Sequence, residues 1–281
     1  MVEGFYPKTV KEAAALLKEH TDCMLAAGGT DIMVIHKKAA HVIFVNQISE
    51  IKEIRKKDGI LSIGAGCTYT ELLREADIPE ILKAAMIQIA SPAIRSTGTV
   101  AGNICNASPA GDTLPVLYAL DAVVVKSFLG ENGSVCTKRI PIQEFILGIR
   151  KIALEAQELV TAIEIREAVY QNATSVYYQK VGARQSEAIS KLSFAALAET
   201  KENRILDIRI AFGSVGITVI RREELEGEMK GLTMKELKEK SGAILEQYDA
   251  CIHPISDQRS TAEYRKKVCM NLLADFLEQI K

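Results

Sequence analysis

The segment GTVAGNICNASPAGDTLP, residues 98–115, contains small and short polar side chains and almost no large apolar ones. Glycines at positions 98, 102 and 111, together with several Thr, Asn and Ser residues, favour turns and local hydrogen bonds. We therefore expect an irregular segment, which inside a compact fold usually has a function. A ligand rich in hydrogen-bonding groups would satisfy its backbone, and an ordered structural loop is the alternative. Asp112 precedes the apolar run LPVLYAL and is a candidate N-cap for a helix there.

The segment LAAGGTDI, residues 25–32, is a second candidate ligand site. An apolar strand ends at Gly28 and Gly29, and Thr30 and Asp31 open the next element. Glycine lets backbone N–H groups approach a phosphate closely, and successive N–H groups in a turn form a concave anion site. The Thr30 hydroxyl can add a donor, whereas the Asp31 carboxylate would cap the turn or accept a hydroxyl proton. A plain strand-to-helix turn explains the same residues equally well.

The flanking sequence indicates an α+β protein. TVKEAAALLKEH predicts a helix that Thr9 caps, with Glu12 in the capping-box position. Strands are predicted for CMLAAGG, HVIFVNQI, ILSIGAG, QELVTAIEIRE, ATSVYYQKVGAR and RILDIRIAFGSV. The final helix has an apolar stripe of Val268, Leu272, Leu273 and Phe276. Strands and helices do not alternate strictly, so the pattern favours α+β over a doubly wound sheet.

Composition excludes several classes of protein. The 281 residues carry a net charge of −1 and are 48% hydrophobic, which is typical of a globular protein without general affinity for nucleic acid. The N-terminus has no signal-peptide pattern and no apolar run could span a bilayer, so we expect a cytoplasmic protein. The six cysteines lack CxxC spacing, and His36 and His41 are five positions apart, so we expect no metal site.

Other sequence patterns give no sign of catalytic side chains. IGAGCTY, residues 63–69, lacks the third glycine of a dinucleotide-binding fingerprint, so it indicates a strand that turns into a helix. No Gly-x-Ser-x-Gly elbow and no convincing nucleophile–base pair are present. We therefore assign no catalytic side chain to this chain.

Taken together, these motifs resemble those of the FAD-binding medium subunits of the molybdenum hydroxylases. LAAGGTDI is similar to the AGGT-D motif of that family, and TVAGNICNASPAGDTLP is similar to its T-I-G-G-N-x-x-x-x-S-P-x-x-D-x-x-P stretch. The spacing between the two motifs fits, as do the later segments AFGSVG…IR and STAEYRKKVCMNLL. The resemblance covers essentially the whole chain and extends to xanthine, carbon-monoxide and nicotinate dehydrogenases.

The resemblance implies a fold and a set of FAD contacts. It implies a vanillyl-alcohol-oxidase/PCMH-type FAD-binding domain at 1–168, with subdomains at about 1–57 and 58–168, and a smaller α+β domain at 169–281. The residues that match the family's pyrophosphate-binding positions are Leu25, Ala26, Ala27, Gly28, Gly29, Thr30, Asp31, Ile32, Thr99, Gly102 and Asn103. Asp112 matches a position at a ribose or adenine hydroxyl, Val160 one near the adenine, and Ile89 and Lys180 positions near the flavin ring. The loop GARQSE is expected near the flavin face.

By the same resemblance, the chain is an oxidoreductase, the FAD subunit of a multi-subunit molybdenum hydroxylase. A large partner subunit would oxidise the substrate, a purine or another N-heterocycle, at a molybdopterin. Electrons would pass through [2Fe–2S] clusters of a small partner subunit to this FAD and on to NAD⁺ or another acceptor. The protein itself would position and tune the cofactor. Ala101 replaces a family glycine, which favours an alternative: a non-catalytic flavin- or nucleotide-binding regulatory protein that kept the fold.

Overall fold

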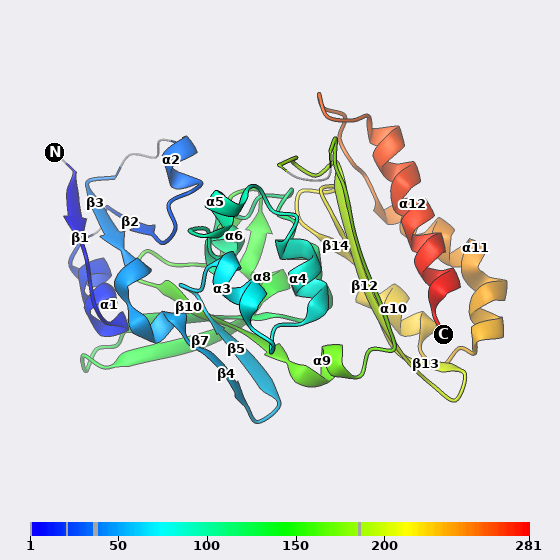
Figure 1. Ribbon diagram of the computed structural model, residues 1–281, viewed down its shortest axis with the longest axis horizontal. Coiled ribbons are helices and arrows are strands. Elements are labelled where there is room, and N and C mark those ends of the chain that lie inside the picture. Colours follow the sequence, from blue (N-terminus) through cyan, green and yellow to red (C-terminus); the bar gives the residue numbers. More distant parts are fainter. Residues whose placement is uncertain (1, 21, 36–38, 185–186) are drawn as a thin grey trace. The chain divides into compact units, whose positions relative to one another are not determined.

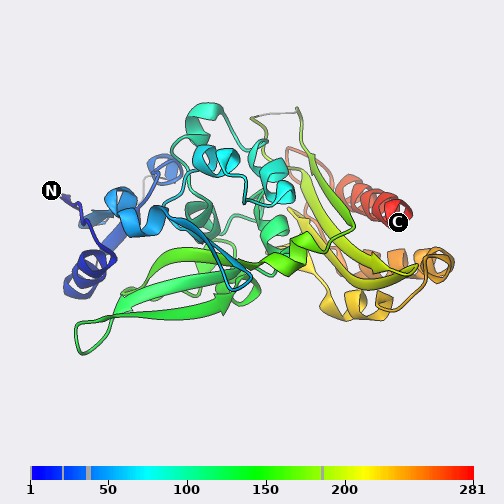
Figure 2. The same ribbon diagram turned by 60° about the horizontal axis from the view of Figure 1, so that its bottom comes forward.

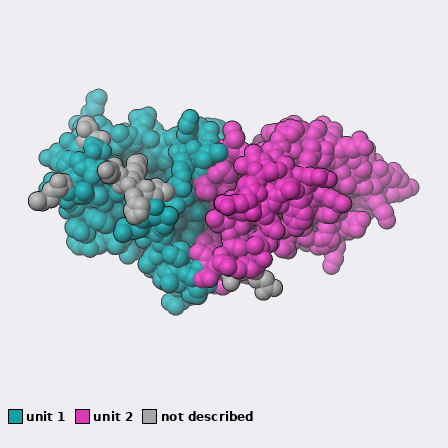
Figure 3. Space-filling model, turned by 90° about the horizontal axis from the view of Figure 1, so that it is seen from above, with its two compact units in different colours: residues 1–77, 91–107, 122–166 teal, residues 78–90, 108–121, 167–281 magenta. Residues whose placement is uncertain are grey.

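The computed structural model describes residues 2–20, 22–35, 39–184 and 187–281 (Figure 1, and turned by 60° in Figure 2). The chain forms two compact units, which Figure 3 shows in different colours. Unit 1 contains residues 1–77, 91–107 and 122–166, and unit 2 contains residues 78–90, 108–121 and 167–281. Each unit is therefore assembled from three separate stretches of chain. The domain boundary expected between residues 168 and 169 stays a prediction.

Unit 1 contains two sheets and a small hairpin. The first sheet is parallel, in the order β1 (Glu3–Phe5), β3 (His41–Phe44), β2 (Cys23–Ala26). The second is antiparallel, in the order β4 (Ile54–Lys57), β5 (Ile60–Gly64), β10 (Leu159–Arg166), β6 (Val123–Leu129), β7 (Val135–Pro141). The hairpin pairs β8 (Ile146–Gly148) with β9 (Lys151–Ile152). The helical segments are α1 (Val10–Glu19), α2 (Ile32–Ile35), η1 (Val45–Gln47), η2 (Ser49–Lys52), α3 (Tyr69–Arg74), α5 (Pro92–Arg95), α6 (Val100–Asn106) and α8 (Ile142–Phe145).

Capping residues explain where the helices of unit 1 begin. The Thr9 hydroxyl accepts a hydrogen bond from the Glu12 backbone N–H at 3.1 Å and starts α1, as predicted. The Glu12 carboxylate accepts from the Lys8 backbone N–H. At α3, Thr68 and Glu71 make both bonds of a capping box. IGAGCTY is therefore a strand, β5, that turns into a helix, as the sequence indicates.

The segment expected to be irregular is partly helical. The Thr99 hydroxyl accepts from the Gly102 N–H at 3.0 Å and starts α6. Val100, Ala101 and Ile104 of α6 are buried. Burial of this apolar face outweighs the low helix propensity of glycine, which dominated the sequence prediction. The expectation of irregular structure is therefore wrong for residues 100–106.

Unit 2 is built on an antiparallel sheet in the order β11 (Ser175–Val181), β12 (Leu192–Lys201), β13 (Arg204–Gly213), β14 (Ile220–Arg221). Figure 1 shows α11 (Met234–Cys251) and α12 (Ala262–Gln279) on one face of this sheet. The other helices are α4 (Glu80–Met86), α7 (Leu114–Ala119), α9 (Glu167–Gln171) and α10 (Glu223–Met229). The helix predicted at LPVLYAL is thus present as α7. The observed α+β content confirms the predicted fold class.

Strand β12 is buried on both faces. Residues 192–198 are all buried, and Phe194, Ala196 and Ala198 share one core with Leu273 and Phe276 of α12. Helix α7 packs on β12 and β13. The apolar stripe predicted for the last helix therefore faces the core, and Val268 and Leu272 pack against the same cluster. A strand covered on both faces becomes continuously apolar rather than alternating.

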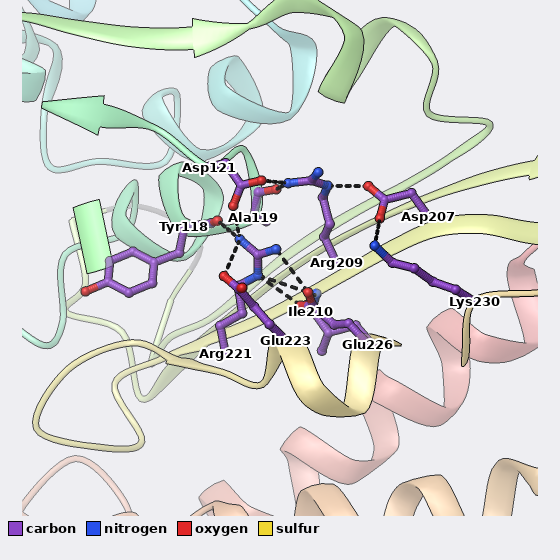
Figure 4. Close-up of polar contacts among 10 residues, drawn as sticks. All are labelled: Tyr118, Ala119, Asp121, Asp207, Arg209, Ile210, Arg221, Glu223, Glu226 and Lys230. Atoms are coloured by element: carbon purple, nitrogen blue, oxygen red, sulfur yellow. Dashed lines mark hydrogen bonds and ion pairs between the residues drawn. The ribbon is translucent and has the colours of Figure 1, made fainter. Parts of the chain in front are cut away.

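A network of partly buried charges joins the C-terminal end of α7 to the sheet of unit 2 (Figure 4). Arg221 contacts Asp121 at 2.5 Å and Glu226 at 3.0 Å. Arg209 contacts Asp121 and, at 2.6 Å, Asp207. Lys230 completes the chain of contacts at 2.7 Å from Asp207. With Glu223, which lies 3.9 Å from Arg221, four acids and three bases make up the network, and each charge has an opposite neighbour.

We expect the stability contribution of Asp121 to disappear in acid. Burial disfavours the charged carboxylate, but Arg221 and Arg209 together outweigh this, so the pKa of Asp121 lies below its ordinary value of 3.8. A carboxyl with a lowered folded-state pKa stabilises the fold above its unfolded pKa, and this stabilisation is lost as the pH falls toward the folded pKa. Asp121→Asn should therefore lower the free energy of unfolding by about 2–3 kcal/mol at pH 7 and by much less near pH 3.

Urea unfolding of the wild type and the variant between pH 7 and pH 3 measures this effect. Glu131→Gln, at an exposed position of the β6–β7 turn, is the control and should change stability little at any pH. A gap between wild type and Asp121→Asn that stays constant across this range would contradict the electrostatic interpretation.

Candidate functional site

The two glycine motifs contact each other in unit 1. A Cβ built on Gly28 would lie 1.9 Å from the Thr97 carbonyl oxygen and 3.0 Å from the Gly98 Cα, so no side chain fits there. A Cβ on Gly98 would lie 3.6 Å from the Thr30 Oγ1. The end of β2 therefore packs backbone-to-backbone against the segment that leads into α6. The two segments predicted from sequence as ligand sites therefore contact each other at Gly28, Thr30 and Gly98.

Gly29 has a different reason to be glycine. Its φ is +71°, a left-handed conformation, and no atom lies within 4 Å of a Cβ built there. Within the described part of the chain, the backbone N–H groups of Gly28, Gly29 and Thr30 donate to no protein acceptor. Neighbouring N–H groups without protein partners form a concave anion site. This geometry favours the anion-binding interpretation over a plain turn.

The second motif contributes the start of α6. Thr99 is buried and its hydroxyl caps the helix, and the Asn103 backbone N–H bonds to the Thr99 carbonyl at 3.1 Å. Gly102 is exposed, and a Cβ there would lie 3.0 Å from Thr99 Oγ1. Ala101 lies in the helix with its methyl group buried, and its φ is not positive. Alanine is therefore compatible with the backbone at the position where the resemblance implies a glycine.

Arg150 connects the two motifs, and the sequence analysis missed it. Its guanidinium contacts the Asp31 carboxylate at 3.1 Å and the Asn106 side-chain oxygen. Its backbone N–H bonds to the Ala107 carbonyl at 3.1 Å. The Asp31 carboxylate thus has an arginine partner in unit 1. Arg150 and Asp31 are 119 positions apart, so no local pattern indicates the contact.

The other predicted residues of unit 1 lie on β2, on β10 or directly beside the glycine turn. Leu25 and Ala26 belong to β2 and pair with Ile43 and Phe44. Val160 is buried in β10, the strand that α6 packs on. Ala27 and Ile32 flank the glycine turn, on either side of Gly28–Asp31.

A buried ion pair organises the three predicted residues of unit 2. The Lys180 Nζ lies 2.7 Å from the Asp112 carboxylate and 3.0 Å from the Gln88 carbonyl, next to Ile89. Ser190 donates to the other carboxylate oxygen of Asp112. Burial raises the pKa of Asp112 above its ordinary value, although Lys180 and Ser190 oppose the shift. The expectation that Asp112 caps α7 is wrong, because its carboxylate binds Lys180 and Ser190 while Thr113 precedes the helix without a side-chain cap.

The remaining reactive side chains of the described structure lack a metal-binding arrangement. No group of three or more His, Cys, Asp or Glu side chains among the described residues could hold a metal ion. His36 lies outside the described residues, as do Gln185 and Ser186 of the GARQSE loop. Desolvation raises the pKa of Cys105 to about 12, so it stays a protonated thiol inside α6. None of the described helices is long and apolar enough to cross a membrane.

Comparison with known proteins identifies the family. Residues 1–166 match the family described as the FAD binding domain in molybdopterin dehydrogenase. The chain belongs to this family. Residues 177–280 match the CO dehydrogenase flavoprotein C-terminal domain. The predicted family, the FAD cofactor and the oxidoreductase class are thereby confirmed, together with the order of an FAD-binding domain and a C-terminal domain.

Relatives of this FAD-binding family match nearly the full length of the chain. The medium chain of carbon monoxide dehydrogenase from Hydrogenophaga pseudoflava is 30% identical over 92% of this chain and 90% of its own length. The xanthine dehydrogenase FAD-binding subunit of Escherichia coli O157:H7 is 27% identical over 92% and 88%. A solved structure of the Hydrogenophaga carbon monoxide dehydrogenase, which lacks the Mo-pyranopterin moiety, superposes with a TM-score of 0.87 at 26% identity, covering 99% of this chain and 96% of that one.

The residues of unit 1 fit the FAD of this family. The Gly28–Thr30 turn presents N–H groups that donate to no acceptor among the described residues, and the space beside Gly29 is open. A pyrophosphate is the part of FAD that needs such donors, because it carries negative charge and many acceptor oxygens.

Proposed function

We propose that this chain is the FAD subunit of a multi-subunit molybdenum hydroxylase. In this proposal, electrons reach FAD from [2Fe–2S] clusters of a small partner subunit and leave to NAD⁺ or another acceptor. A large partner subunit carries the molybdopterin and oxidises the substrate, a purine or another N-heterocycle. The observation that carries the proposal is the turn at Gly28–Thr30, which packs against Thr97 and Gly98 and whose N–H groups donate to no acceptor among the described residues.

The chain's own residues would bind and orient the cofactor. The N–H groups of the Gly28–Thr30 turn would hold the pyrophosphate, and Thr99, Gly102 and Asn103 would line the other side. Val160 would lie near the adenine. Arg150 would keep the two motif segments together through its contacts with Asp31 and Asn106. When bound, FAD supplies the redox chemistry, which no described side chain of this protein provides.

In unit 2, Lys180 would contact the flavin ring and Ile89 would pack near it. Two acceptors, the Asp112 carboxylate and the Gln88 carbonyl, hold the Lys180 ammonium within the described chain. An ammonium has three donors, so a third remains for an acceptor atom of the cofactor. Asp112 would act on FAD through Lys180, in addition to the hydroxyl contact that the family pattern implies.

The substrate and the partners are proposed by analogy with the relatives. The two relatives are named for different substrates, carbon monoxide and xanthine. Their FAD subunits nevertheless match this chain over the same share of its length. A conserved flavoprotein scaffold serving different substrates is consistent with substrate chemistry in another subunit. Ala101 gives the regulatory-protein alternative no support, because an alanine fits the helical backbone at that position.

An absorption spectrum of the purified chain tests the cofactor assignment. We expect flavin bands near ~370 and ~450 nm after FAD is added and the excess removed, with a shift relative to free FAD. NADH should bleach the ~450 nm band if NAD⁺ is the acceptor. A chain that stays colourless after FAD addition would contradict the proposal. A chain that binds FAD but whose flavin is not reduced by NADH would exclude NAD⁺ as the electron acceptor and leave the FAD assignment intact.

A further inference from the structure

The segment from Ser108 to Asp121 is a continuous series of hydrogen-bonded turns within unit 2. The Gly111 N–H bonds to the Ser108 carbonyl, and the Leu114 N–H bonds to the Gly111 carbonyl. Helix α7 continues this series, and the Asp121 N–H bonds to the Tyr118 carbonyl. All six residues of α7 are buried. A block that is hydrogen-bonded along its length and closely packed is expected to move as a unit.

Asp112 lies near the N-terminal end of this block, and two arginines bind its C-terminal end. Arg221 donates to the Tyr118 carbonyl at 2.6 Å, and Arg209 donates to the Ala119 carbonyl at 3.4 Å. Both guanidiniums also contact Asp121 (Figure 4). Arginines at this end satisfy carbonyls that a helix leaves without partners and match the sign of its dipole.

Arg221 is in turn fixed by its own partners. Its side chain is 7% exposed, and Glu226 of α10 accepts from its Nε and its Nη2 at 3.0 Å each. The same carboxylate accepts from the Ile210 backbone N–H of β13 at 2.8 Å. The Glu226 carboxylate thus fixes the Arg221 guanidinium on the sheet. The guanidinium in turn binds the Tyr118 carbonyl of α7 and the Asp121 carboxylate that follows α7. A planar fork with several donors can make all these bonds, whereas a lysine ammonium cannot.

The middle of the block packs closely against the end of β13. A Cβ on Gly213 of β13 would lie 2.6 Å from Pro115 Cγ. The Ser214 N–H bonds to the Pro109 carbonyl at 2.9 Å. Gly213, Ser214 and Arg221 all fall in the sequence AFGSVG…IR. This segment therefore contacts the 108–121 block rather than forming a ligand loop of its own.

We infer that Arg221 is a positioning residue for cofactor binding. It fixes α7 on the sheet and thereby sets where the Asp112 carboxylate meets Lys180 and Ser190 at the other end of the block. Arg209 has the same role through Ala119 and Asp121. This inference rests on the proposed FAD function, because the Asp112–Lys180 pair is what Arg221 would position.

A double-mutant cycle on the full-length chain tests the inference, with the FAD dissociation constant as the readout. We expect Arg221→Met to weaken FAD binding about tenfold, the scale seen for coupled residues that do not touch the ligand. In an Asp112→Asn background the same change should weaken binding less than about twofold, because the positioned carboxylate is already altered. Arg221→Lys, which keeps the charge and is the variant to use if Arg221→Met does not fold, should give an intermediate loss.

Leu273→Ala is the matched control for general destabilisation of unit 2. Leu273 is fully buried in α12 and is not part of the charge network, so its truncation should lower stability and leave FAD affinity unchanged. Equal FAD loss in Leu273→Ala and Arg221→Met, or additive effects of Arg221→Met and Asp112→Asn, would overturn the inference. A wild-type chain that binds no FAD would overturn the proposed function and, with it, this inference.

Discussion

Replacing Gly28 with alanine is expected to abolish FAD binding. The new Cβ would lie 1.9 Å from the Thr97 carbonyl oxygen, a backbone atom that no side-chain rotation can move away. The turn and the segment leading into α6 would have to separate, and the N–H groups proposed to hold the pyrophosphate would lose their arrangement. We expect the FAD dissociation constant to rise at least about a hundredfold. Titration of flavin fluorescence measures it directly.

Two neighbouring substitutions separate the reasons for this loss. Gly29→Ala introduces no contact but forces a side chain into φ +71°, so its effect should be smaller, at about 1 kcal/mol. Gly148→Ala meets nothing within 4 Å and needs no positive φ, so it should bind FAD normally. Urea unfolding of each variant shows whether the chain still folds. Normal FAD binding by a folded Gly28→Ala chain would remove this turn from the proposed site.

The second large effect is expected at Lys180. Lys180→Met leaves the Asp112 carboxylate buried without its ammonium partner, which typically costs about 3–5 kcal/mol of stability at neutral pH. The same substitution at Lys235, in an exposed pair with Glu239, should change stability by less than about 1 kcal/mol. The Lys180→Met/Asp112→Asn double variant should recover part of the loss, because no charge is then left buried. Urea unfolding of the four chains measures these differences.

The loss in Lys180→Met should shrink in acid. Burial already raises the pKa of Asp112, and removing Lys180 removes the strongest opposing influence. A carboxyl whose folded pKa lies above its unfolded value destabilises the fold once the pH exceeds the unfolded pKa, and protonation relieves this as the pH falls. The difference from wild type should therefore be smallest near pH 4. A pH-independent difference would mean that lost packing, not the unpaired charge, causes the effect.

Local signals in the sequence were sufficient for most of the fold. Thr9 marks the start of α1, and the apolar stripe of the last helix identifies its core-facing side. They failed at residues 100–106, where Gly102 suggested a loop, because the burial of Val100 and Ile104 depends on contacts that the sequence does not display. The α+β class was predictable because it depends on the order of many elements and not on any single one.

The candidate site was predictable only in part. The glycines at 28 and 29 stand in a recognisable motif, although the structure assigns them two different physical requirements, close approach and positive φ. Arg150 was missed because its partners lie far away in the sequence. Asp112 was interpreted as a helix cap because a following helix is a local signal, whereas Lys180 and Ser190 are 68 and 78 positions distant. Contacts over such distances are set by the fold as a whole.

The interleaving of the chain limits how this protein can be recombined with its relatives. The segment that matches the C-terminal family begins at residue 177, yet unit 2 also contains residues 78–90 and 108–121. Consider a chimaera that takes residues up to 166 from one parent and the rest from another. Its α7 would come from the first parent and would pack on β12 and β13 of the second. Its Asp121 would then face arginines that evolved beside a different partner. Viable exchanges would need to carry α4, α7 and the C-terminal sheet from the same parent.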